Sequence, residues 1–253
     1  MDEESIQKIS NFLREYMDIY GDNLFVDVRR IKKLLSEIVE AEPSAPTTVR
    51  SERKIISQVQ ERRKPNASLW KFREKIKDCT QCPLGHTRTN FVFGDGNPEA
   101  DIMFVGEAPG VEEDRTGIPF VGRAGQLLNK LLSHIKVKRE DVFIANILKC
   151  QPPGNRDPQP TEIQECIPYL HKQIEMIQPK ILVALGRVSA QNLLNTTSSL
   201  KQLRNRLWQY QGFDMIVTYH PAAILRNMGL LNTTIEDFRF IHDTYQEKLK
   251  HQS

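Results

Sequence analysis

Short apolar runs alternate with longer amphipathic segments from about residue 67 onward. Four runs have the length and flanking turns of buried strands, at 101–105, 142–147, 180–185 and 214–219. Helical periodicity occurs near 122–135, 161–177, 187–195 and 234–249. This alternation predicts an α/β fold of three layers, α/β/α, with a central, mostly parallel four-stranded sheet covered on both faces. In such sheets ligands bind beyond the carboxyl ends of the strands, here after residues 105, 146 and 219.

The N-terminal part of the chain follows a different pattern. Residues 1–42 carry apolar side chains at three- and four-residue steps on both sides of Gly21, which predicts a helical extension of two amphipathic helices. Residues 43–66 are rich in Pro, Ser, Thr and basic side chains and predict a basic linker, so that residues 67–253 form the main domain. A short helical pair buries little surface alone, so we expect it to dock on the main domain or on another protein.

Composition is typical of a soluble globular protein, with 39% hydrophobic and 26% charged residues. No run approaches the roughly 18 apolar residues of a membrane helix, so no membrane partner is expected. The acidic N-terminus lacks an apolar signal core, which favours the cytoplasm. The net charge of +3 combines −4 over residues 1–42 with +7 over residues 43–253. A basic body favours an anionic partner, of which nucleic acid is the commonest.

Four cysteines form two clusters along the sequence: Cys79 with Cys82 in a C-x-x-C motif, and Cys150 with Cys166. A zinc ribbon requires a second C-x-x-C, which is missing, but four thiolates suit either Zn²⁺ or an iron–sulfur cluster. The spacing leaves both alternatives open. A redox-active pair is disfavoured because Cys79 precedes the first predicted strand instead of opening a helix after it.

Each predicted strand end is followed by a loop with distinctive chemistry. Gly106 opens a Gly- and Pro-containing turn whose backbone N–H groups can face a ligand, and Phe120 further along offers a ring for stacking. Asn146 ends a strand, and its amide can pair with an imide or amide edge. His220 precedes Pro221, which fixes the backbone so that a ring nitrogen can point into the cleft. Core packing for Phe120 and a turn cap for Asn146 are the ordinary alternatives.

The order of these motifs is specific. It comprises C-x-x-C-P-L-G at 79–85, GEAPGVEED at 106–114, TGIPFVGRAGQLL at 116–128, N-I-L-K-C and a Pro-rich loop at 146–158, Cys166, and H-P-A at 220–222. From about residue 69 to 225, the chain therefore resembles the family 4 uracil-DNA glycosylases, the iron–sulfur branch of that superfamily. The resemblance implies a [4Fe–4S] cluster whose ligands are Cys79, Cys82, Cys150 and Cys166.

The resemblance also implies an activity: hydrolysis of the N-glycosidic bond of uracil in DNA, the first step of base excision repair. It maps Phe120 to the ring that stacks on uracil, Asn146 to the amide that pairs with its edge, and His220 to the group beside the leaving base. The loop that encloses the base corresponds to Gly106, Glu107 and Ala108.

Physical chemistry supports these implied roles. The base must leave the helix, and stacking on Phe120 returns roughly 1–3 kcal/mol without selecting uracil over cytosine. Selection falls to Asn146, because cytosine presents the opposite hydrogen-bonding polarity. His220 and the backbone N–H groups at 106–108 are expected to stabilise negative charge on uracil O2. For activating the water, Glu107 is favoured by position over Glu113, Asp114 and Asn155.

The remaining predictions concern partners. Leu225 and Arg226, just after the histidine loop, are expected to contact DNA as a wedge and a backbone-binding cation. The expected partner is uracil-containing DNA, and the expected state is a monomer. An alternative from another class is a catalytically inactive iron–sulfur adaptor that binds nucleic acid without cleaving any bond.

Overall fold

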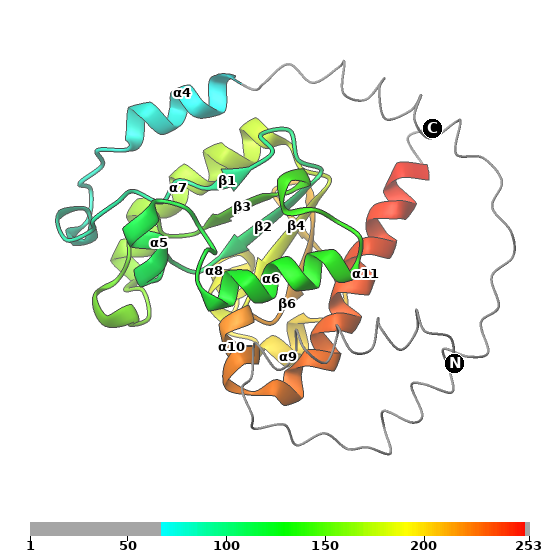
Figure 1. The fold of residues 1–253 in the computed structure, drawn as a ribbon. Coiled ribbons are helices and arrows are strands. Elements are labelled where there is room, and N and C mark those ends of the chain that lie inside the picture. The colour runs from blue at the N-terminus through cyan, green and yellow to red at the C-terminus, as the bar shows by residue number, and fades with distance from the viewer. Residues whose placement is uncertain (1–66, 251–253) are drawn as a thin grey trace, which may run out of the picture. The chain divides into compact units, whose positions relative to one another are not determined.

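A computed structural model describes residues 67–250, so the predicted extension (1–42) and linker (43–66) lie outside the described residues. Its centre is a six-stranded sheet of order β1-β3-β2-β4-β6-β5 (Figure 1). The inner four strands are parallel to one another, whereas β1 and β5 are antiparallel edge strands. The bounds are β1 Asp95–Gly96, β2 Ile102–Gly106, β3 Phe143–Asn146, β4 Ile181–Leu185, β5 Leu207–Tyr210 and β6 Phe213–Thr218.

The predicted fold class is confirmed, and the four predicted strands are β2, β3, β4 and β6. Their continuous apolar runs are buried along almost their whole length, as expected of inner parallel strands. The predicted number of strands, four, was too low because neither of the two edge strands has a continuous apolar run. The first is only two residues long, and the other, Leu207–Tyr210, mixes exposed and buried positions.

Helices cover both faces of the sheet, which confirms the three predicted layers (Figure 1). Met103 and Val105 of β2 enter one apolar core with α4, α7 and α8, while Ile102 and Phe104 enter the opposite core with α6, α10 and α11. The bounds are α4 Ala67–Ile76, α5 Val111–Thr116, α6 Arg123–His134, α7 Pro160–Ile177, α8 Arg187–Leu194, α9 Leu200–Leu203, α10 Pro221–Arg226 and α11 Leu231–Lys250. None of the helices within residues 67–250 has both the length and the apolar character required to cross a bilayer.

The pairing of β2 with β3 fixes the edge of the sheet where the site forms. Gly106 and Asn146 are register partners at the carboxyl ends of these strands. The pairing continues beyond them, because the N–H of Ile147 donates to the Gly106 carbonyl and that of Leu148 to the Glu107 carbonyl, each at 3.0 Å. The loop at 106–108 and the amide of Asn146 are thereby held side by side.

Candidate active site

A cavity of about 590 Å³ opens at the carboxyl ends of the parallel strands. The loops after β2, β3, β4 and β6 all contribute to its lining, as the general rule for open α/β sheets requires. The structure thus brings together most of the site residues predicted from sequence: Glu107, Ala108, Phe120, Asn146, His220 and Arg226.

Gly106 lies against two of the lining side chains. A methyl group on its α-carbon would sit 2.3 Å from Asn146 Oδ1 and 2.8 Å from the Phe120 ring. Both distances are well inside van der Waals contact, so a larger residue would displace the amide or the ring. Glycine at this position is therefore part of the shape of the cavity.

Phe120 forms a rigid aromatic wall. Its backbone has φ of 53°, in the left-handed region that a phenylalanine seldom adopts. Arg139 holds this conformation by donating to the carbonyls of Pro119 at 2.6 Å and of Phe120 at 3.2 Å. The side chain is 5% exposed, and its ring centroid lies 5.4 Å from that of His220 at an interplanar angle of 37°. The ring is fixed at a place where a planar ligand can stack on it.

The amide of Asn146 is buried with an unused acceptor. The residue is 2% exposed and lines the cavity, yet Oδ1 has no hydrogen-bond partner within the described part of the chain. An unpaired buried polar atom costs about 1–3 kcal/mol. A ligand that brings an N–H group to this oxygen would remove that cost.

His220 is arranged as a neutral hydrogen-bond donor. It is the N-cap of α10, and its Nδ1 accepts from the backbone N–H of Ala222 at 3.1 Å. The ring proton of the neutral form is therefore on Nε2. Burial, and secondarily the charge of Arg226, lowers the pKa of His220 to about 4. At neutral pH the ring offers Nε2–H without carrying a charge of its own.

The end of β6, which leads into His220, is fixed by a buried ion pair. Arg204 donates to both carboxylate oxygens of Asp237, at 2.6 and 2.7 Å, and Thr218 Oγ1 donates to the same carboxylate at 2.6 Å. The Arg204 guanidinium also lies 4.4 Å from the centre of the Tyr219 ring. These contacts hold the two residues that immediately precede His220.

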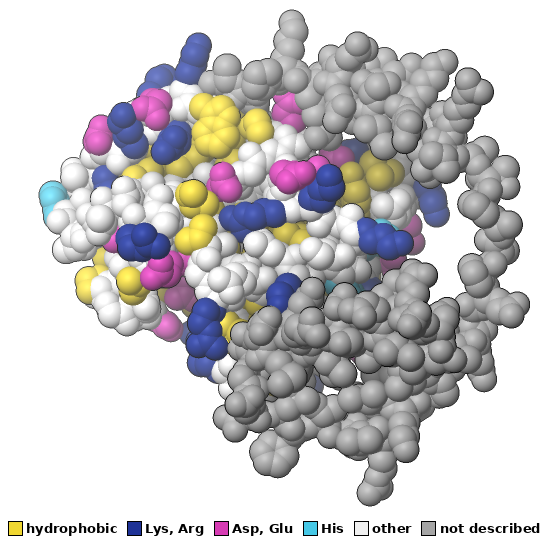
Figure 2. All heavy atoms as spheres, viewed as in Figure 1, with side chains coloured by type: hydrophobic (Ala, Val, Ile, Leu, Met, Phe, Trp, Pro, Cys, Tyr) yellow, Lys and Arg dark blue, Asp and Glu magenta, His cyan; other side chains and the backbone are white. Residues whose placement is uncertain are grey.

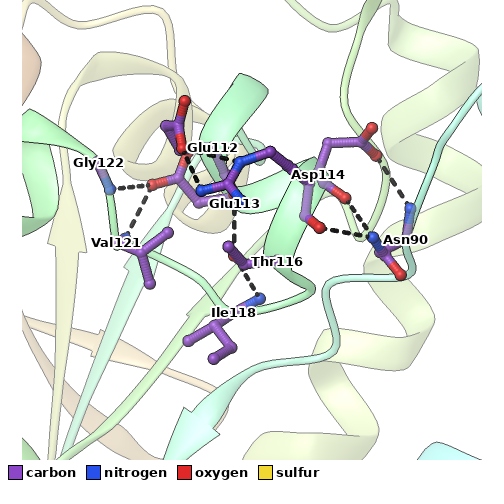
Figure 3. A network of polar contacts seen from close by, with 9 residues as sticks. Asn90, Glu112, Glu113, Asp114, Thr116, Ile118, Val121 and Gly122 are labelled. Carbon is purple, nitrogen blue, oxygen red and sulfur yellow. Dashed lines mark hydrogen bonds and ion pairs between the residues drawn. The ribbon is translucent and has the colours of Figure 1, made fainter.

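Two of the acidic residues considered for water activation hold loops instead (Figure 3). One Glu113 oxygen accepts from the N–H groups of Val121 and Gly122, at 2.9 and 3.0 Å, and the other accepts from Gly110 N–H at 3.1 Å. Asp114 is buried and accepts from the backbone N–H groups at 89 and 90. Both carboxylates therefore have a structural role as acceptors of backbone N–H groups.

Of the acidic residues considered for water activation, Glu107 is the one left available to the cavity. It is half-buried, and no residue within 67–250 hydrogen-bonds to its carboxylate. Burial raises its pKa, Asp157 raises it further, and Arg187 and Arg226 oppose these effects. Asn155 also lines the cavity, with Oδ1 accepting from Gln151 Nε2 at 2.8 Å. A half-buried carboxylate with a raised pKa can hold a water and take its proton.

The two predicted DNA contacts differ in placement. Arg226 is exposed and lines the cavity, whereas Leu225 is half-buried against the core between the sheet and α6. The leucine that lines the cavity is Leu230.

On the face shown in Figure 2, basic side chains are interspersed with acidic ones over the described surface. The basic charge expected from composition is therefore not one continuous patch on that face.

The four cysteines are free thiols and line a second, smaller cavity. Hydrogen-bond donors contact three of the sulfurs: Arg88 Nη1 reaches Cys150 at 3.2 Å, Tyr169 Oη reaches Cys79 at 3.2 Å, and the backbone N–H of Lys149 reaches Cys166 at 3.3 Å. Within residues 67–250, no three Cys, His, Asp or Glu side chains form a tight group around a single point. The donor set, four thiols that line one small cavity and receive N–H and O–H bonds, has the chemistry of a site for a thiolate-bound metal group.

Comparison with known proteins identifies the family to which this fold and these motifs belong. Residues 93–241 match the family described as the uracil DNA glycosylase superfamily. A type-4 uracil-DNA glycosylase of Sulfurisphaera tokodaii is 46% identical over 185 residues, which cover 70% of this chain and 84% of that protein. The chain belongs to the type-4 uracil-DNA glycosylases. A type-4 uracil-DNA glycosylase of Thermotoga maritima is 47% identical over 168 residues, covering 65% of this chain and 88% of that protein. The family assignment made from the motifs is confirmed.

Relatives with a different type number are more distant. A type-5 uracil-DNA glycosylase of Pyrobaculum aerophilum is 32% identical over 155 residues, covering 54% of this chain and 67% of that protein.

Several cavity residues of this type-4 family member were missed by sequence analysis. Arg187 and Asp157 form an ion pair of 2.9 Å at the cavity, although thirty positions separate them in the chain. The position of Arg187, directly after Gly186 at the end of a predicted strand, was a usable signal, because ligands bind at strand ends. Nothing in the local sequence links Asp157 to it.

Proposed function

We propose that the chain is a monofunctional uracil-DNA glycosylase that acts as a cytoplasmic monomer in base excision repair. The single observation that carries the proposal is the buried, unpartnered Oδ1 of Asn146, in a cavity that also contains the Phe120 ring and the Nε2–H of His220. The helical extension and linker of residues 1–66 stay predictions.

The amide provides the selection for uracil. Asn146 Oδ1 accepts from uracil N3–H while Nδ2 donates to O4, and the base stacks on Phe120. Cytosine has an acceptor at N3 and a donor at C4. It would therefore leave both the Oδ1 acceptor and the Nδ2 donor of the buried amide without a partner. A polar site of this kind rejects the wrong partner far better than an apolar one does, because each unpaired buried group costs about 1–3 kcal/mol.

The reaction is a hydrolysis at the sugar carbon C1′. The C1′–N1 bond breaks, its electron pair leaves with uracil, and the oxygen of a water molecule forms the new bond to C1′. Negative charge collects on uracil O2, where His220 donates from Nε2 without a proton transfer. Glu107 takes the proton released by the water and passes it to solvent, and the departing base is protonated in turn. A donor placed in advance where charge develops is worth about 10²–10³ in kcat.

Arg226 is the proposed contact to the DNA backbone, because it is exposed at the cavity and has no ion-pair partner within the described residues. Insertion of Leu225 between bases stays a prediction.

The second cavity is the proposed site of a [4Fe–4S] cluster held by Cys79, Cys82, Cys150 and Cys166. The free thiols, the shared cavity and the donors to sulfur support this choice. When bound, the cluster would cross-link the segment at 79–82 to α7. The residues of the first cavity would carry out bond cleavage. Iron and sulfide content with broad absorption near about 400 nm would identify it, whereas one zinc per chain would contradict it.

The test of the activity uses purified full-length protein and a uracil-containing oligonucleotide, followed by alkaline cleavage of the abasic product. We expect strand cleavage that depends on uracil, and its loss in Asn146→Ala and His220→Ala. A cytosine-containing oligonucleotide is the matched substrate control. DNA binding without cleavage by the wild type would favour the inactive adaptor.

A further inference from the structure

A lysine lies fully buried between the two cavities. Lys149 is 0% exposed, in the loop that leads from Asn146 at the end of β3 to Cys150. Its long side chain remains inside the protein instead of reaching water. Lysine is among the residue types that are almost never fully buried unless paired.

The ammonium group of Lys149 binds the backbone of the uracil-reading residue. Nζ donates to the Asn146 carbonyl at 2.8 Å and to Gln173 Oε1 of α7 at 2.6 Å. Gln173 in turn donates through Nε2 to the carbonyl of Phe93 at 2.9 Å. The strand end that carries the amide is thus tied through one cation to the helix that carries Cys166.

The backbone of Lys149 is tied to the cysteine cavity as well. Its N–H donates to Cys166 Sγ at 3.3 Å, and its carbonyl accepts from the N–H of Val92 at 2.8 Å. One residue therefore contacts a thiol of the second cavity with its main chain and the end of β3 with its side chain.

An apolar residue would be the less costly choice at this position. A buried ammonium loses several kcal/mol of hydration, and replacing buried charges by apolar side chains of similar volume is often neutral or stabilising. Within residues 67–250, no carboxylate forms an ion pair with Lys149, and its Nζ is held by two neutral acceptors, the Asn146 carbonyl and Gln173 Oε1. These two hydrogen bonds, and not an ion pair, are what the buried lysine contributes at this position.

We propose that Lys149 is a positioning residue that couples the two cavities: its side chain fixes the Asn146 main chain so that the amide faces uracil, and its contacts with Gln173 and Cys166 tie that strand end to α7 and the cysteine site. This inference rests on the proposed function and deepens it. Its consequence is that the affinity for uracil depends on a residue that does not line the uracil cavity and whose contacts reach the cysteine site.

The test replaces Lys149 by methionine, which is unbranched, keeps most of the length and removes the charge and the donors. Binding of free uracil is measured by titration calorimetry, and loss of absorbance near about 400 nm is followed after addition of a chelator. We expect uracil affinity to fall by about tenfold or more and absorbance to decay faster. We also expect kcat on DNA to fall with little change in KM, because the exposed backbone contacts remain. Lys180→Met is the matched control, since Lys180 is a half-buried lysine paired with Asp101 at the opposite ends of the strands.

Each outcome decides the inference. Uracil affinity within twofold of the wild type in Lys149→Met overturns it, as does a change in only one of the two readouts or an equal change in Lys180→Met. If Lys149→Met does not fold, Gln173→Leu removes one of the two acceptors of the ammonium, and an unchanged uracil affinity there overturns it. Failure of the wild type to excise uracil would instead refute the proposed function, so the two failures are distinguishable.

Discussion

Substituting His220 by glutamine removes an imidazole that the fold keeps neutral. Glutamine is a polar side chain of similar size, and loss of the Nδ1 acceptor of the Ala222 N–H costs the variant the same free energy at every pH. Glutamine does not titrate, and that difference makes its effect on stability dependent on pH. The variant therefore isolates the cost of keeping an uncharged histidine in the cavity wall.

The size of the effect follows from the pKa. The unfolded chain takes up a proton on this histidine as the pH falls through its ordinary value of about 6.5, whereas the pKa in the folded protein is about 4. Between these values the free energy of unfolding of the wild type falls by about 1.4 kcal/mol per pH unit, and by about 3 kcal/mol in total at pH 4. Above pH 7 the histidine contributes no such dependence, and His220→Gln lacks it throughout.

Urea denaturation at several pH values between 7 and 4 measures this difference. The free energy of unfolding of the wild type should decrease relative to that of His220→Gln over this range, by about 3 kcal/mol. His134→Gln is the matched control, because it removes an exposed imidazole outside the cavity. Curves for wild type and His220→Gln that stay parallel from pH 7 to pH 4 would refute the neutral, buried imidazole.

Three further substitutions test other parts of the structure. Gly106→Ala should abolish detectable binding of free uracil in calorimetry, because the added methyl group meets Asn146 Oδ1 at 2.3 Å, while costing only about 1–3 kcal/mol in denaturation experiments. Asp237→Ala should lower the free energy of unfolding by about 3–5 kcal/mol, since it leaves Arg204 buried without its partner; a loss below 1 kcal/mol would contradict this. Arg88→Met removes a donor to a cysteine sulfur, so absorbance near about 400 nm should decay faster in chelator than in the wild type, and an equal rate would count against that role.

The inner sheet could be predicted because its strands are buried on both faces and so have continuous apolar runs. The edge strand Leu207–Tyr210 could not, because two of its four side chains are exposed and only pairing with β6 makes it a strand. Asn146 and His220 were predictable from their positions at strand ends. The role of Glu113 was not, because its hydrogen-bond partners at 121 and 122 are brought near by a turn rather than by helical spacing.

The burial of Lys149 could not be predicted from the sequence either. A lysine next to a cysteine in a Pro-rich segment is typical of an exposed loop, and no local pattern indicates burial. Only the tertiary contact with Gln173, 24 positions away, shows where its charge lies.

The register pairing of Gly106 with Asn146 constrains how the chain can change in length. A single residue inserted into β3 would turn the Asn146 side chain to the opposite face of the sheet, and a two-residue insertion would restore its direction but move it by about 6.6 Å along the strand. Either change exceeds the reach of a hydrogen bond. If Asn146 reads the base as proposed, insertions and deletions compatible with activity are confined to the connecting loops, and the length of β3 acts as a molecular ruler for the base.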